Sequence, residues 1–162
     1  RRGDTFLLTY SGHGLAGTTP AGFQQSWCLY DDTLLRFGED GLDALLARFE
    51  PGVRLLLVAN CCYAASRGER TPATPRIRAH LVRITASTGR DVTFDRPDGK
   101  GPSPFVARFL DALASHEDGG FAGFHQRLSS PPSAMMSPQM EIQEPHDRDF
   151  LRLGPFRLAS AD

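Results

Sequence analysis

The feature that most constrains the fold is a run of five apolar residues, LLLVA, at positions 55–59. The run is too short for a buried helix and too uniform for a half-solvated strand, so it predicts a central parallel strand covered on both faces. In open α/β sheets ligands bind beyond the carboxyl ends of the strands. Asn60, Cys61 and Cys62 follow this strand directly, and we therefore expect chemistry there.

A second apolar run ends in the same way. Residues 5–10, TFLLTY, lead into Ser11-Gly12-His13-Gly14. Because the carboxyl ends of parallel strands meet at one edge of a sheet, we expect His13 and Cys62 to lie on the same rim. The sequence therefore predicts a histidine and a cysteine in one site.

Composition excludes several classes of protein. The chain of 162 residues is 40% hydrophobic with a formal net charge of −1, which predicts one globular domain and gives no electrostatic reason to expect nucleic acid. No apolar run is long enough to span a bilayer. Three cysteines without C-x-x-C or Cys/His spacing predict neither a disulfide framework nor a metal site, and we expect a reducing, cytoplasmic setting without a cofactor.

The remaining pattern predicts an α/β chain with a mostly parallel sheet. Apolar periodicity indicates helices at 39–49, 105–114 and 121–128, and strands at 26–30, 80–86 and 150–153. Glycine and proline mark 15–25 as a mobile loop beside the site, and 67–78 and 89–104 as further loops.

The first strand starts unusually close to the first residue. Residues 5–10 are fully apolar, which is typical of a strand with neighbours on both sides. We therefore expect an N-terminal fragment or a second chain to complete the sheet.

These residues resemble the caspase-like cysteine peptidases, in particular the bacterial and metacaspase-type branch. The resemblance rests on Ser11-Gly12-His13-Gly14 after one strand and on Asn60-Cys61-Cys62-Tyr63-Ala64-Ala65 after another. The spacing of His13 and Cys62 agrees with the roughly 50 residues between histidine and cysteine in caspases. The resemblance covers residues 1–162 and implies a three-layer sandwich, with helices flanking a mostly parallel sheet and the first part of the domain lacking.

The family's catalytic roles fall on two residues. Position in the motif makes Cys62 the nucleophile and His13 the general base and then acid, whereas Cys61 points away and packs. A free thiol has a pKa of roughly 8.5, so it needs a neighbouring base at neutral pH. The N–H groups of Gly14 and Cys62 are the candidates for the oxyanion hole. Taken alone, both cysteines also fit buried structural residues.

The resemblance also bears on specificity and activation. Asp31 and Asn60 occupy the positions of two acidic residues that line the S1 pocket in metacaspases, so we expect cleavage after arginine or lysine; a turn or cap role for Asp31 is the alternative. Four arginines lie where relatives are cleaved on activation, although a solvated loop explains them equally well. These candidate processing residues are Arg67, Arg70, Arg76 and Arg78.

Two departures from the family pattern leave other functions open. Tyr63 replaces a histidine and Ala65 a glycine, which is compatible with a catalytically inactive interaction module. A separase- or CHAT-type protease of the same clan is the other alternative. The partner we expect is a protein or peptide substrate, with regulation by proteolysis or an associated sensor, and a calcium requirement is left open.

Overall fold

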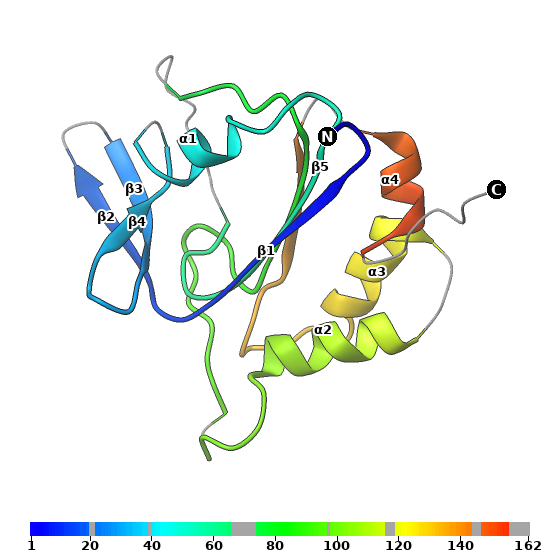
Figure 1. The fold of residues 1–162 in the computed structure, drawn as a ribbon. Coiled ribbons are helices and arrows are strands. Elements are labelled where there is room, and N and C mark those ends of the chain that lie inside the picture. The colour runs from blue at the N-terminus through cyan, green and yellow to red at the C-terminus, as the bar shows by residue number, and fades with distance from the viewer. Residues whose placement is uncertain are drawn as a thin grey trace.

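A four-stranded sheet in the order β1-β5-β6-β7 forms the centre of the molecule in a computed structural model (Figure 1). The structure describes residues 1–19, 22–38, 40–65, 74–96, 98–115, 119–143 and 147–155. The strands of this sheet are β1 (Thr5–Ser11), β5 (Arg54–Asn60), β6 (His80–Thr85) and β7 (Gln139–Gln143).

The sheet is mixed and mostly parallel. Strands β1, β5 and β6 run parallel to one another, and β7 pairs antiparallel with β6. This arrangement confirms the predicted α/β class and the central place of β5, whose five middle residues are all buried. A strand covered by side chains on both faces needs an uninterrupted apolar run, which residues 55–59 supply.

Two apolar clusters cover the two faces of the sheet. One face, with Leu55 and Leu57, packs against helix α1 (Leu42–Leu46) and against Trp27 and Phe37. The other face packs against three helices, α2 (Pro104–Ala114), α3 (Gly120–Ser129) and α4 (Arg148–Leu153), which gather on one side in Figure 1. Period-2 alternation along β5 thus sends successive side chains into different cores.

A second, three-stranded antiparallel sheet lies between β1 and α1 in the chain. It contains β2 (Gly14–Thr19), β3 (Gly22–Cys28) and β4 (Leu34–Arg36). The prediction of a mobile loop at 15–25 is therefore wrong. Glycine content favoured a loop, but pairing of β2 with β3 supplies the backbone hydrogen bonds that make this segment a hairpin.

The chain also differs from prediction near its last described residues. Residues 150–153 form part of helix α4, not a strand. Asp147 caps this helix by accepting hydrogen bonds from the N–H groups of Asp149 and Phe150, which is a helix-start signal that the apolar residues concealed. The last described strand is β7, and it begins directly after Ser137-Pro138.

The predicted helices are present with altered bounds. The segment 39–49 contributes only Leu42–Leu46 to a helix, which begins after Gly41, whose φ of −134° is not helical, and ends before Ala47. Helices α2 and α3 lie close to the predicted ranges, and Ser103 caps α2 through the N–H of Val106. Among the described residues, no helix has the length and apolar character needed to cross a membrane.

Strand β1 is not covered as expected. It is the edge strand of the sheet, and its side chains are mostly exposed, including Phe6 at 41% and Leu7 at 42%. Among the described residues nothing pairs with its outer edge, so the expected N-terminal fragment or second chain stays a prediction. An exposed apolar edge strand is an unusual surface for a native sheet.

Candidate functional site

The register of two parallel strands brings the histidine and cysteine turns together. Ser11 at the end of β1 is paired with Asn60 at the end of β5. His13 and Cys62 each follow two residues later, and the N–H of Gly12 donates to the Asn60 carbonyl at 3.2 Å. The structure thus places both predicted catalytic residues at the same edge of the sheet.

Gly14 shows how closely the two turns approach. A Cβ built on Gly14 would lie 1.9 Å from the carbonyl oxygen of Cys62 and 3.4 Å from the Cβ of Cys61. Only glycine fits such an approach to a backbone oxygen. The backbone next to His13 therefore packs directly against the backbone of the candidate nucleophile.

Gly12, on the other side of His13, makes room for an aromatic ring. A Cβ on Gly12 would lie 2.8 Å from the hydroxyl oxygen of Tyr10. A side chain is thus excluded at Gly12 by the Tyr10 hydroxyl and at Gly14 by the Cys62 carbonyl.

The turn after β5 is sharp and is held on several sides. Tyr63 has a φ of 52°, which non-glycine residues seldom adopt and which occurs preferentially at functional sites. The hydroxyl of the fully buried Ser87 donates to the Cys61 carbonyl at 2.8 Å and accepts from the Ala64 N–H at 3.1 Å. These bonds fix the main chain on both sides of Cys62.

The two adjacent cysteines lie in different environments. Cys61 is 1% exposed and belongs to the apolar cluster around Trp27. Burial, followed by the neighbouring Cys62, raises the pKa of Cys61 to about 12, so this thiol stays protonated at neutral pH. Cys62 is half-buried, and its thiol donates to the Thr93 carbonyl at 3.5 Å. Of these two adjacent cysteines, only Cys62 is accessible to solvent.

Strand pairing determines where the N–H of Gly14 points. The Cys28 N–H donates to the His13 carbonyl at 2.9 Å, so His13 and Cys28 form a hydrogen-bonded pair. In an antiparallel ladder such pairs alternate with non-bonded ones, and the next pair is Gly14 with Trp27. The ladder pattern therefore predicts that the Gly14 N–H points away from β3.

The two residues expected to line the S1 pocket have separate contacts. Asp31 is exposed, and its carboxylate accepts from the Thr33 N–H at 3.1 Å; bonds from Thr33 hold the pKa of Asp31 below its ordinary value. Asn60 Nδ2 donates to the Ser11 hydroxyl at 2.9 Å. Within the described part of the chain, the buried Oδ1 of Asn60 has no hydrogen-bond partner.

The candidate processing residues are only partly described. Arg67 and Arg70 lie outside the described residues, whereas Arg76 and Arg78 are exposed and flank the buried Ile77. Basic side chains at 76 and 78 are thus on the surface.

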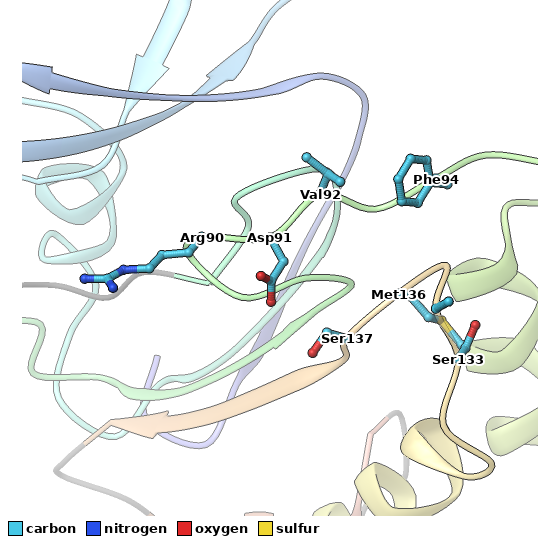
Figure 2. A pocket seen from close by; sticks show the side chains of 8 residues that line it. Arg90, Asp91, Val92, Phe94, Ser133, Met136 and Ser137 are labelled. Atoms are coloured by element: carbon cyan, nitrogen blue, oxygen red, sulfur yellow. The ribbon is translucent and has the colours of Figure 1, made fainter.

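A pocket of about 370 Å³ lies beside the cysteine turn (Figure 2). Its wall is the segment after β6: the Asp91 carbonyl accepts from the Tyr63 N–H at 2.9 Å, and the Thr93 carbonyl accepts from Cys62. In Figure 2 the Asp91 carboxylate points to the side of Ser137, whereas Arg90 extends away from the other labelled side chains. The lining residues are Arg90, Asp91, Val92, Phe94, Ser133, Ala134, Met136 and Ser137.

Sequence reasoning missed this pocket. The polar segment Ser87 to Asp91 follows the buried strand β6 just as Asn60 to Cys62 follow β5. The same rule, that ligands bind beyond the carboxyl ends of parallel strands, would have selected Asp91. We interpreted residues 89–104 only as a loop because of their glycine and proline content. Among the described residues, no group of three His, Cys, Asp or Glu side chains is placed to hold a metal ion.

Comparisons with known proteins give a relative in fold. No protein-family model matches the sequence, and no curated protein matches it. The crystal structure of protein GSU0716 from Geobacter sulfurreducens is similar to this chain with a TM-score of 0.76, over 98% of this chain and 73% of that chain. The two sequences are 23% identical. The similarity shows a shared fold.

Proposed function

We propose that the chain is a cysteine endopeptidase of caspase-like fold. The observation that carries this proposal is the pairing of Ser11 with Asn60, with Gly14 packed on the Cys62 carbonyl, because it sets His13 and Cys62 on adjacent turns. A half-buried thiol and an exposed imidazole on adjacent turns are the two groups that a Cys-His dyad needs.

The dyad accounts for hydrolysis of a peptide bond in two steps. His13 takes the thiol proton, the Cys62 sulfur attacks the scissile carbonyl carbon, and the proton passes to the leaving amine as the C–N bond breaks. Water then attacks the thioester, gives its proton to His13, and releases the acid and the thiol. The N–H groups of Gly14 and Cys62 stabilise the oxyanion in both steps.

The pocket beside Cys62 supports a basic P1 residue. The exposed Asp91 lines it, and its carboxylate accepts from the Thr88 hydroxyl at 2.6 Å. A guanidinium or ammonium group forms charge-assisted hydrogen bonds with a carboxylate such as this one. Asp31, which holds its own turn, is the second candidate for this role.

The open edge of β1 supports a partner for the sheet. Phe6 and Leu7 present exposed apolar surface beside an edge strand. An N-terminal fragment or second chain that adds a strand there would satisfy the edge and bury these side chains.

Cleavage of a peptide library tests the proposed activity. The wild-type protein is incubated with internally quenched peptides that differ at P1, and the products are sequenced by mass spectrometry. We expect cleavage after arginine or lysine, and Asp91→Asn to reduce it more than Asp31→Asn. Thiol-dependent cleavage after other residues would keep the peptidase and overturn the basic pocket, while absence of cleavage would favour an interaction module.

A further inference from the structure

Tyr10 occupies a distinctive place beneath the histidine turn. Its hydroxyl lies 2.8 Å from the His13 carbonyl oxygen and 2.7 Å from the Cys28 carbonyl oxygen. Both neighbours are acceptors, so the hydroxyl proton is shared between them or alternates. Burial raises the pKa of Tyr10 above its ordinary value, which keeps the hydroxyl a donor at neutral pH.

The ring of Tyr10 is itself fixed. It stacks on Trp27 with ring centroids 4.4 Å apart and an angle of 3° between the planes. Trp27 is 2% exposed and meets Phe37 edge-on at 5.5 Å. The hydroxyl is thus attached to the apolar core and reaches the turn through the space that Gly12 leaves open.

We propose that Tyr10 is a positioning residue for His13. This inference rests on the proposed function. Tyr10 does not touch the substrate: its hydroxyl holds the His13 main chain in register with Cys28, while Gly14 holds it against Cys62. The main-chain atoms from which the exposed His13 side chain extends are then held in place. This matters because the largely exposed strand β1 gives the turn little support from packing. Small displacements of a catalytic base are costly to the rate.

The substitution Tyr10→Phe tests the contribution of the hydroxyl apart from that of the ring. The variant keeps the stack on Trp27 and removes one oxygen atom, so the protein should fold. With an arginine P1 peptide we expect kcat to fall by roughly tenfold at unchanged KM, because substrate binding does not involve Tyr10. Tyr30→Phe is the matched control, since Tyr30 is fully exposed, and it should match the wild type.

A second readout does not need turnover. The rate of Cys62 alkylation by iodoacetamide at pH 7 is measured for the wild type, His13→Ala, Tyr10→Phe and Tyr30→Phe, with the labelled cysteine identified by mass spectrometry. We expect Tyr10→Phe to lie between wild type and His13→Ala. Equal rates for wild type and His13→Ala would contradict the dyad and, with it, this proposal. A rate for Tyr10→Phe equal to wild type, while His13→Ala is slower, would overturn only the role of Tyr10.

Gly12→Ala supplies an independent variant. Its Cβ would crowd the Tyr10 hydroxyl, so it should reproduce the loss of kcat. The two changes act on one contact, and their effects should therefore be less than additive when combined. Full additivity would contradict the proposed coupling. Gly17→Ala, with nothing within 4 Å of its Cβ, is the control.

Discussion

The two strands that deliver the candidate dyad are neighbours with opposite degrees of support. β5 is buried along its five central residues, and the turn that follows is held by Ser87 and by the segment after β6. β1 is largely exposed, and the turn that follows depends on Tyr10, Cys28 and Gly14. The turn that carries Cys62 is therefore anchored to the buried core, whereas the turn that carries His13 is held by a few specific contacts beside a largely exposed strand.

The largest difference should appear when one leucine is truncated in each strand. Leu7 and Leu56 are paired in register, yet Leu56 is 2% exposed and Leu7 is 42% exposed. Leu56→Ala should lower the free energy of unfolding by about 2–5 kcal/mol, and Leu7→Ala by roughly 1 kcal/mol or less. Urea denaturation measures both. Similar losses for the two variants would mean that β1 is covered in solution.

The next contrast concerns two glycines in one strand. Gly14→Ala places a Cβ against the Cys62 carbonyl, whereas Gly17→Ala meets nothing within 4 Å. We expect Gly14→Ala to cost about 1–3 kcal/mol of stability, as other overpacked sites do, and to abolish most Cys62 reactivity. Gly17→Ala should change neither. Thermal unfolding and iodoacetamide labelling would show this, and a harmless Gly14→Ala would contradict the close approach of the two turns.

Two serines provide a contrast of similar size. Ser87→Ala removes two buried hydrogen bonds from the main chain around Cys62. Each buried group left without a partner costs about 1–3 kcal/mol, so we expect lower stability and a slower Cys62 reaction. Ser11→Ala removes one exposed bond, which Asn60 Nδ2 donates to the Ser11 hydroxyl, and should cost less than about 0.5 kcal/mol. Hydrogen exchange at Ala64 would rise only in Ser87→Ala; no rise would show that other contacts hold this turn.

The smallest effect concerns the buried thiol. The pKa of Cys61 is about 12 in the folded chain against roughly 8.5 when unfolded. Above pH 8.5 the unfolded chain loses this proton first, so the free energy of unfolding falls as pH rises toward 12. Between pH 8 and 9.5 this fall amounts to about 1 kcal/mol. It should be absent in Cys61→Ala and retained in Cys28→Ala, and an unchanged slope in Cys61→Ala would place Cys61 in contact with water.

Much of the fold follows from local pattern. The apolar run at 55–59 identifies the central strand, and the spacing of apolar residues identifies α2 and α3. The hairpin of β2 and β3 could not be predicted from composition, because glycines and threonines form strands there only through pairing with each other. Helix α4 was missed since the Asp147 cap was not weighed against the apolar residues that follow.

Some residues of the candidate site could likewise be predicted from the sequence and others could not. Motif and strand-end reasoning selected His13 and Cys62, which the register then brought together. It did not select Asp91, Ser87 or Tyr10. The roles of Asp91 and Ser87 depend on contacts between residues far apart in sequence, and that of Tyr10 depends on the hydrogen bond from its hydroxyl to the His13 carbonyl. Such contacts are fixed by tertiary packing and leave no periodic signal.

Labelling with a peptidyl acyloxymethyl ketone that carries arginine at P1 tests the central claim most directly. The three cysteines, Cys28, Cys61 and Cys62, are reported separately by mass spectrometry of the labelled protein. We predict labelling of Cys62 that is lost in Cys62→Ala, strongly slowed in His13→Ala and unchanged in Cys61→Ala. Labelling of Cys61 or Cys28 instead, or labelling of Cys62 at the same rate without His13, would contradict the dyad.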